Sequence, residues 1–307
     1  MAHKLNRALV STNLQALASS PMGFAWQDFI LSRRTICSSE KTIKWYEHTA
    51  GQFACWLADR EITDPLAIRA LHVRMYLEEF KAGGASENYV HSHARAVKTL
   101  LRFLHEEKYT PELIKFTMPP LSKQRLPYLK ADEVLKVIQH CENPRDKAII
   151  LLMVDTGIRR TELVDLNWED IDLKTGVVTI QRGKGGQTRS VVIGAATRRA
   201  VFAYARTIVH RTDAPLFQTR HGTRIQVNGL RSLLLRISER SGIHIAPHAL
   251  RRTFATLALK AGMNPLHLQG LLGHSSLEMT RRYVQMMDED LVEAHRMYGP
   301  VDHALKK

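Results

Sequence analysis

The segment Lys115–Tyr128, which reads KFTMPPLSKQRLPY, decides how this chain is organised. Its three prolines remove backbone donors and fix φ, so the segment favours an extended, fairly stiff connector over a helix. It is also basic through Lys123 and Arg125, so it either lies along a phosphate backbone or is simply a solvated linker. We therefore expect a domain boundary here, with the linker at residues 117–127.

The residues before this connector show helical periodicity with clear start and stop signals. Asp64-Pro65 offers an N-cap followed by a first-turn proline, Ser86 offers another cap, and Gly83-Gly84 ends a helix. The pattern predicts four helices, at residues 24–35, 40–58, 65–81 and 87–106. We expect residues 1–23 to form an N-terminal arm and 24–116 a helical domain.

The residues after the connector are also mostly helical, and they are interrupted by a short β-rich insert. Helices are predicted near 131–141 and 144–156, the second ending at Gly157. Two β-prone runs, 177–182 and 188–193, are joined by a glycine-rich turn and predict a hairpin. The second domain is expected to span 128–307.

The composition is that of a folded, strongly basic protein. The 307 residues include 44 Lys and Arg against 30 Asp and Glu, a formal net charge of +14, and 44% of residues are hydrophobic. A basic excess favours a polyanionic partner, either nucleic acid or an anionic membrane surface. The most apolar run, 148–154, is far too short to span a bilayer. Three widely spaced cysteines form no disulfide or metal motif and favour the cytoplasm.

Two polar clusters follow the first helices of the second domain. Arg159 and Glu162 lie three residues apart on one face of a helical turn, where they form either a clamp for phosphate or a plain surface ion pair. Lys184 lies at the glycine-rich hairpin tip, where a flexible ammonium either reaches a ligand or is merely solvated. The surrounding residues lack the spacing of a nucleotide-binding P-loop.

Two further clusters lie near the C-terminus. Pro247 opens a helix on which His248 and Arg251 project together, a plausible anion site. A zinc site at this position is disfavoured because no Cys or acidic residue has ligand spacing nearby. In LLGHSSLEMTRRY, residues 271–283, His274 follows a helix end and Tyr283 lies about two turns into the next helix.

The order and spacing of one set of residues resemble those of the tyrosine recombinase (phage integrase) family. The set is Arg159, Lys184, His248-x-x-Arg251, His274 and Tyr283. The resemblance covers about 128–290 and is to the two-domain, Xer-like or transposon-type site-specific recombinases. It implies a mainly α fold. The N-terminal part would be a four-helix, SAM-like core-binding domain that binds DNA. The C-terminal part would be a mostly helical catalytic domain with a small three-stranded β-sheet.

The resemblance also implies a metal-free reaction at a DNA strand. Tyr283 would attack the scissile phosphodiester, forming a 3′-phosphotyrosyl bond and releasing a 5′-hydroxyl. Lys184 would protonate the leaving oxygen, and His248 would act as a base or orient the phosphate. No cofactor or metal ion is expected, because arginines and a lysine supply the positive charge.

The remaining members of the set would stabilise the transition state. Arg159, Arg251 and His274 would donate hydrogen bonds to the nonbridging phosphate oxygens, where negative charge accumulates. Glu162 would support the pocket indirectly, without contacting the phosphate itself.

By the same resemblance, the partner is double-stranded DNA with inverted half-sites, bound by a homotetramer on two DNA sites. Residues 288–307 would dock on a neighbouring subunit or pack within their own chain. Further DNA contacts are expected from basic side chains, namely Lys123, Arg125, Arg252, Arg281 and Arg282.

Two other functions fit parts of this pattern. A non-catalytic, architectural DNA-binding protein would share the fold and the charge, but it would have no need of Tyr283 beside two arginines and His274. A type IB topoisomerase shares much of the chemistry, but the compact two-domain layout favours the recombinase.

Overall fold

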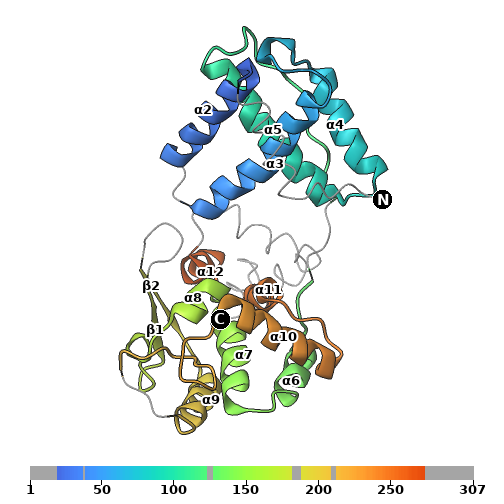
Figure 1. The fold of residues 1–307 in the computed structure, drawn as a ribbon. Helices are drawn as coiled ribbons and strands as arrows, with labels where there is room; N and C mark the ends of the chain where they lie inside the picture. The colour runs from blue at the N-terminus through green and yellow to red at the C-terminus, as the bar shows by residue number, and fades with distance from the viewer. Residues whose placement is uncertain (1–18, 37–38, 123–126, 182–187, 209–211, 274–307) are drawn as a thin grey trace, which may run out of the picture. The chain divides into compact units, whose positions relative to one another are not determined.

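The computed structural model (Figure 1) describes residues 19–36, 39–122, 127–181, 188–208 and 212–273. The chain forms two compact units, the first ending at Gln124 and the second beginning at Arg125. This division falls within the proline-rich connector.

The N-terminal unit is helical throughout its described residues. Ser86 caps one helix by accepting a hydrogen bond from the Tyr89 N–H (3.3 Å), and Gly84, with φ +75°, follows the end of another. The α-helices are α2 (Pro21–Ile36), α3 (Glu40–Ala58), α4 (Ala70–Ala82) and α5 (Glu87–Glu106). Residues 1–18 lie outside the described part, so the number of helices in the whole domain stays a prediction.

The helix predicted at 65–81 is wrong in its first turn. Pro65–Ala67 is a separate 3₁₀ turn, capped by the Asp64 carboxylate, which accepts from the Leu66 N–H (2.8 Å). Ile68 follows with extended backbone (ψ 137°) and a side chain buried in the core, and α4 begins only at Ala70. The extended residues that carry Ile68 inward therefore divide the predicted helix in two.

Aromatic side chains fill the core of this unit. The Tyr76 ring on α4 lies 5.1 Å from the Phe53 ring on α3 and 4.9 Å from Phe80, centroid to centroid, in tilted and edge-on contacts. Tyr76 also forms a buried hydrogen bond with His93 of α5 (2.8 Å). These contacts fix α3, α4 and α5 against one another.

The connector is held at both ends. On the N-terminal side, the Glu87 carboxylate at the start of α5 accepts from both the N–H (2.9 Å) and the hydroxyl (2.7 Å) of Ser122. On the C-terminal side, the carbonyl of Pro127 accepts from Arg252 Nε (2.9 Å), and the Leu129 N–H donates to Thr253 Oγ1 (2.8 Å).

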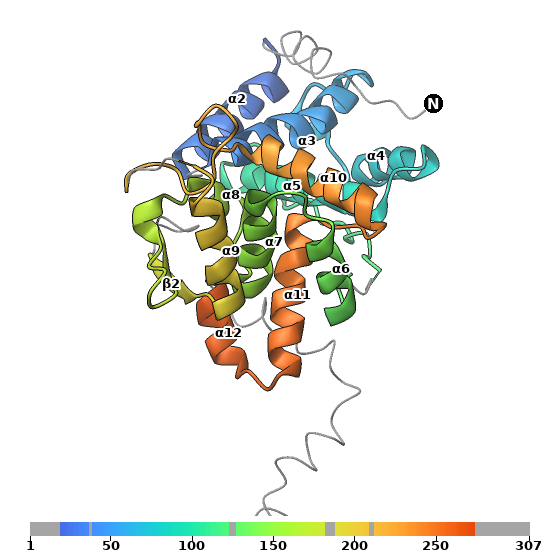
Figure 2. The same ribbon diagram turned by 90° about the horizontal axis from the view of Figure 1, so that it is seen from below.

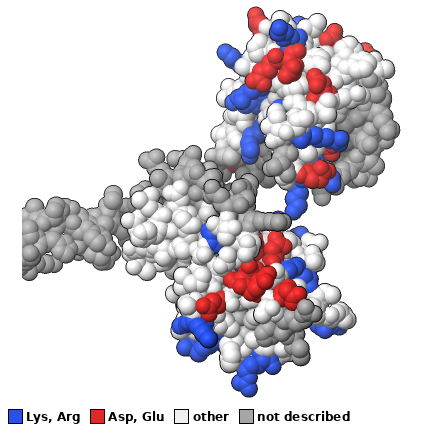
Figure 3. All heavy atoms as spheres, turned by 90° about the vertical axis from the view of Figure 1, so that its left-hand side faces the viewer, with Lys and Arg blue, Asp and Glu red and all other residues white. Residues whose placement is uncertain are grey.

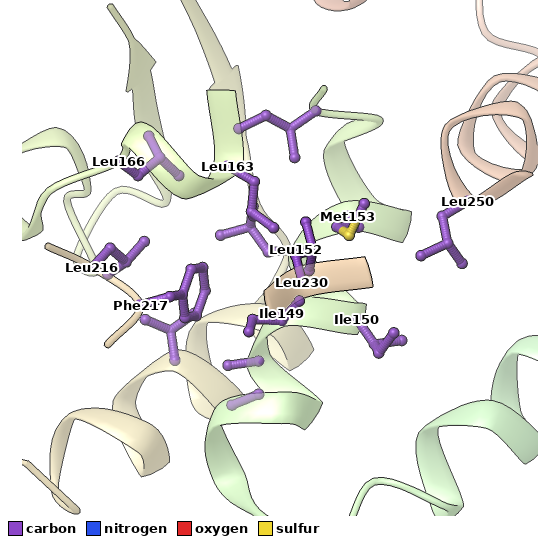
Figure 4. Packing of buried hydrophobic residues seen from close by; sticks show 14 of the residues in the cluster. Ile149, Ile150, Leu152, Met153, Leu163, Leu166, Leu216, Phe217, Leu230 and Leu250 are labelled. Atoms are coloured by element: carbon purple, nitrogen blue, oxygen red, sulfur yellow. The ribbon is translucent and has the colours of Figure 1, made fainter. Parts of the chain in front are cut away.

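The C-terminal unit is built around α7. Figure 2 shows α7 with α9 on one side and α11 on the other, and α7 contacts both. Figure 4 shows Leu152 of α7, Leu163 of α8 and Leu230 of α10 packing together in the core. The α-helices are α6 (Ala131–Gln139), α7 (Pro144–Thr156), α8 (Arg160–Asp165), α9 (Ala195–Ala205), α10 (Val227–Ser241), α11 (Pro247–Lys260) and α12 (Pro265–Leu272), with a 3₁₀ turn at Trp168–Asp170.

The β-rich insert is an antiparallel pair. β1 (Val177–Ile180) runs beside β2 (Arg189–Val192), with Val178 opposite Val191. Partly buried and fully buried positions alternate along β1, as expected for strands with one face on the core.

The expectation of a three-stranded sheet is wrong for the described residues, which form a two-stranded sheet. Ile171 makes an isolated bridge to Val178, and Asp172 immediately begins a turn. In that turn the Asp172 carboxylate accepts from the Lys174 N–H (2.7 Å) and the Thr175 hydroxyl (2.8 Å). Because the turn begins one residue after the bridge, the segment before β1 is too short to add a third strand.

Both units carry basic and acidic side chains on their surfaces. On the face drawn in Figure 3, basic and acidic side chains lie beside one another in both units. Before Tyr128 the sequence has 17 basic against 12 acidic residues, and from Tyr128 onward 27 against 18, so each part has a basic excess. Among the helices that the structure describes, none is long and apolar enough to cross a membrane.

Candidate active site

Arg159 lies where α7 ends and α8 begins. Gly157 ends α7 in the left-handed conformation (φ +60°), and Arg159 occupies the N-cap of α8. Its backbone N–H donates to Glu162 Oε2 (2.9 Å) and its Nη1 to Glu162 Oε1 (2.7 Å). The side chain of Glu162 is only 5% exposed, so this pair is not a plain surface ion pair.

Glu162 accepts hydrogen bonds from two arginines. Arg189, from β2, donates Nη1 to Oε1 (2.9 Å) and Nη2 to Oε2 (2.8 Å). Burial alone would raise the pKa of Glu162, but the hydrogen bonds from Arg189 and Arg159 outweigh burial and lower the pKa to about 2. The carboxylate is therefore ionised throughout the neutral range.

Arg251 joins the ends of two helices. It lies on α11, is 6% exposed, and donates Nη1 to the Gly157 carbonyl (2.7 Å) and Nη2 to the Leu272 carbonyl (2.7 Å). Arg159 Nη2 donates to the next carbonyl, that of Gly273 (2.8 Å). Two arginines that are distant in the sequence thus meet at the C-terminal end of α12.

His248 lies in the first turn of α11 and is solvent-exposed. Partial desolvation, and then the positive charges of Arg160, Arg252, Arg251 and Arg159, lower its pKa below the ordinary value. The imidazole is therefore neutral at pH 7, free to accept a proton or a hydrogen bond.

The structure leaves part of the predicted set outside its described residues. These residues are Lys184, His274 and Tyr283, together with the expected DNA contacts Lys123, Arg125, Arg281 and Arg282 and the tail 288–307. Arg252 is described, and it bonds the connector carbonyl of Pro127. The described residues include no cluster of three His, Cys, Asp or Glu that could hold a metal ion.

The described geometry provides a compact cationic site. Planar guanidinium forks match the geometry of phosphate oxygens, and both Arg159 and Arg251 are fixed by hydrogen bonds before any ligand binds. Such fixed donors can stabilise charge that develops in a transition state without reorganising.

A model of a known protein family matches this part of the chain. Residues 127–290, more than half of the chain, match the model of the phage integrase family.

The chain belongs to the phage integrase family.

Its relatives are tyrosine recombinases. The chain is 30% identical to tyrosine recombinase XerC of Listeria innocua over 292 residues, covering 89% of this chain and 95% of that protein. It is 36% identical to tyrosine recombinase XerA of Saccharolobus solfataricus over 176 residues, covering 56% of this chain and 58% of that protein.

Solved structures share the fold. The crystal structure of XerA recombinase matches 90% of this chain and 98% of that chain at 25% identity, with a TM-score of 0.52. A lambda integrase dimer bound to a COC′ core site matches 84% of this chain and 93% of that chain at 20% identity, with a TM-score of 0.71. The integrase fold is thus shared by proteins with little sequence identity.

Sequence reasoning missed Arg189. On β2 it lies two residues before buried Val191, so both side chains lie on the face directed at the core. An arginine on the buried face of an amphipathic strand is uncommon and calls for a buried acid as its partner. The alternation of side chains along the strand could have indicated that Arg189 faces the core. Nothing in the sequence indicated which acid it pairs with.

Proposed function

We propose that this site-specific recombinase cleaves and rejoins DNA strands through Tyr283, with a 3′-phosphotyrosyl intermediate. The observation that carries the proposal is the meeting of Arg159 and Arg251 on the carbonyls of Gly273 and Leu272. His274 follows Gly273 directly in the sequence, and Tyr283 follows nine residues later. The two arginines therefore bind the chain just before the segment that carries the proposed nucleophile.

Arg159 and Arg251 would bind the nonbridging oxygens of the scissile phosphate. The attack of the Tyr283 oxygen gathers negative charge on those oxygens, and fixed cationic donors stabilise it. His274 would supply a further donor, and Glu162 would hold Arg159 in place. Since the phosphotyrosine retains the energy of the broken bond, a 5′-hydroxyl can reverse the step without ATP.

Proton transfer would be divided between two side chains. Lys184 would protonate the leaving 5′-oxygen. His248 has the neutral imidazole that a base or a phosphate-orienting group requires, because the surrounding arginines lower its pKa. A bound phosphate would add negative charge among those arginines and raise the pKa of His248 again.

The proposed substrate is duplex DNA with inverted half-sites, bound by a homotetramer on two sites. Solved relatives support this reading, including XerH site-specific recombinase bound to palindromic difH substrate, which covers 84% of this chain at 22% identity with a TM-score of 0.65. Residues 288–307 are the proposed docking tail between subunits. The proposed compartment is the cytoplasm, on the cysteine pattern of the sequence.

The N-terminal unit is proposed to bind DNA through α5. Between Glu87 and Glu106 this helix has no acidic residue. Its exposed positions Arg95, Lys98 and Arg102 recur at helical spacing and form one basic face. Such a stripe is the electrostatic footprint of a phosphate-binding surface.

The proposal is tested by trapping the covalent intermediate. Nicked duplexes made from the DNA flanking the gene are incubated with the wild-type protein, and DNA that becomes covalently linked is isolated and sequenced. On the duplex so identified, Tyr283→Phe should abolish the adduct while leaving DNA affinity within about twofold, because only the attacking oxygen is lost.

A second tyrosine serves as the matched control. Tyr89→Phe removes a hydroxyl from a tyrosine of the N-terminal unit and should leave adduct formation unchanged. An undiminished adduct in Tyr283→Phe would refute Tyr283 as the nucleophile. Tight binding of the wild-type protein without any adduct would instead favour an architectural DNA-binding protein.

A further inference from the structure

Arg189 is one of the two arginines in a three-residue charge network around Glu162. Arg189, Glu162 and Arg159 have side chains that are 13%, 5% and 23% exposed, so the acid is the most buried member and Arg159 the most exposed. Glu162 accepts from four donors in all, two on Arg189 and two on Arg159, the backbone N–H included. Arg159 is the arginine that faces solvent, where a phosphate would bind.

Arg189 also contacts the end of α12, to which Arg159 donates a hydrogen bond. Its Nε donates to the Leu271 carbonyl (3.0 Å). Its side chain packs on the backbone of Gly273, where a Cβ would lie 3.1 Å from Arg189 Cδ. Gly273 is the residue whose carbonyl accepts from Arg159. Arg189 therefore supports both groups that hold Arg159, the Glu162 carboxylate and the end of α12.

The charges of this network decide what Arg159 can do. With both arginines present, one carboxylate faces two guanidinium groups, and the network keeps a net positive charge for an anion. Without Arg189, the single charge of Glu162 would be matched by Arg159 alone, and the pair would be neutral. In a partly buried site such a change in net charge acts strongly on a bound phosphate.

We propose that Arg189 is a positioning residue for the DNA cleavage step, which neutralises Glu162 so that Arg159 keeps its charge for the scissile phosphate. This inference rests on the proposed function. Arg189 itself does not touch the phosphate; it acts through Glu162 and through the end of α12.

The experiment is a double-mutant cycle on the nicked duplex selected with the wild-type protein. Arg189→Met should slow single-turnover adduct formation at least tenfold, with the DNA dissociation constant changed by less than about threefold. Arg189→Met combined with Glu162→Gln should form the adduct several times faster than Arg189→Met alone, because a neutral amide no longer cancels the charge of Arg159.

A pH profile separates this role from loss of structure. Without Arg189, Glu162 loses two hydrogen bonds that lower its pKa, so it should protonate at a higher pH than in the wild type. The rate of Arg189→Met relative to wild type should therefore recover as the pH is lowered. A variant that is merely destabilised gains nothing from acid.

Arg145→Met is the matched control. Arg145 bonds the buried Asp146 carboxylate (Nε, 3.1 Å) and the Gln218 carbonyl (Nη1, 2.9 Å), a similar network elsewhere in the same unit. It should lose stability like Arg189→Met but form the adduct at the wild-type rate, at a temperature where circular dichroism shows all variants folded.

The outcomes distinguish this inference from the proposed function. If Arg189→Met cleaves as fast as wild type, or if Glu162→Gln restores nothing at any pH, the inference is wrong while Tyr283 chemistry stands. If the wild-type protein forms no adduct, the proposed function fails first.

Discussion

At the scale of single residues, Glu162 organises the charges of the candidate active site. A buried carboxylate is costly unless it is paired, and here four donors from Arg159 and Arg189 offset that cost. Its pKa of about 2, against an ordinary 4.5, measures how strongly the folded protein favours the ionised form. This difference links the stability of the fold to pH.

Glu162 should make the fold sensitive to acid. Since its pKa is lower in the folded than in the unfolded chain, its contribution is complete above about pH 4.5 and is lost as the pH falls toward 2. The pKa difference corresponds to about 3 kcal/mol. The free energy of unfolding, measured by urea denaturation, should therefore differ most between wild type and Glu162→Gln at neutral pH, and the difference should shrink below pH 4.5.

Other titrating groups are common to both proteins and cancel in that difference. A difference that stays constant from pH 7 to pH 3 would show that Glu162 is not held ionised by its arginines.

The predictability of the site differs from residue to residue. The pairing of Arg159 with Glu162 could be predicted from the sequence, because three-residue spacing brings side chains together within one helical turn. Arg189 lies 27 residues from Glu162 and reaches it only through the tertiary fold, so no local spacing discloses their contact. The convergence of Arg251 on Gly157 and Leu272 is likewise a product of packing.

At the scale of elements, helix ends form the site. α7 ends at Gly157 and α12 at Gly273, both with positive φ, and both glycine carbonyls accept from an arginine. A Cβ at Gly157 would lie 2.6 Å from Phe254 Cδ1 and 2.7 Å from Leu272 Cδ2. Glycine is therefore required at this helix end for two reasons. The backbone has a positive φ, and there is no space for a Cβ.

Two glycine substitutions should separate these two requirements. Gly242 ends α10 with φ +69° and has nothing within 4 Å of an added Cβ, so Gly242→Ala should cost about 1 kcal/mol of stability from backbone strain alone. Gly157→Ala should cost a further 1–3 kcal/mol or so from overpacking. Thermal denaturation of both variants checks this.

Gly157→Ala should also slow adduct formation, because it shifts the carbonyl that holds Arg251, whereas Gly242→Ala should not. Equal stability and equal cleavage in the two variants would contradict a packed helix end at Gly157.

The ends of helices could be predicted from the sequence where local capping residues set them. The start of α7 at Pro144 and its end before Gly157 follow from the Asn143 cap and the glycine. The break after Pro65–Ala67 could not be predicted, because the burial of Ile68 is a consequence of tertiary packing. Nor could the absence of a third strand among the described residues, because the early turn at Asp172 depends on the hydrogen bonds of one side chain.

At the scale of the whole molecule, the charge of +14 governs DNA binding. Each phosphate neutralised by a Lys or Arg releases a counterion, so the logarithm of affinity should fall linearly with the logarithm of salt concentration. Lys98→Gln combined with Arg102→Gln, on the basic face of α5, should reduce the magnitude of that slope by about 2. Fluorescence anisotropy at a series of salt concentrations measures it.

The matched control removes the same charge from another helix of the N-terminal unit. Arg74→Gln combined with Lys81→Gln, both on α4, should leave the slope unchanged. Equal slopes in the two double variants would mean that α5 is not the DNA-binding face.

The two anchors of the connector set an upper limit on its reach. Ser122 is tied to Glu87 and Pro127 to Arg252, so five peptide units separate the anchored residues. Fully extended, these units span about 18 Å, a length of about five base pairs. When one unit holds a duplex, the other is confined nearby at a high effective concentration. On the proposal that both units bind DNA, the whole chain should bind a duplex more tightly than either unit does, without any additional contact.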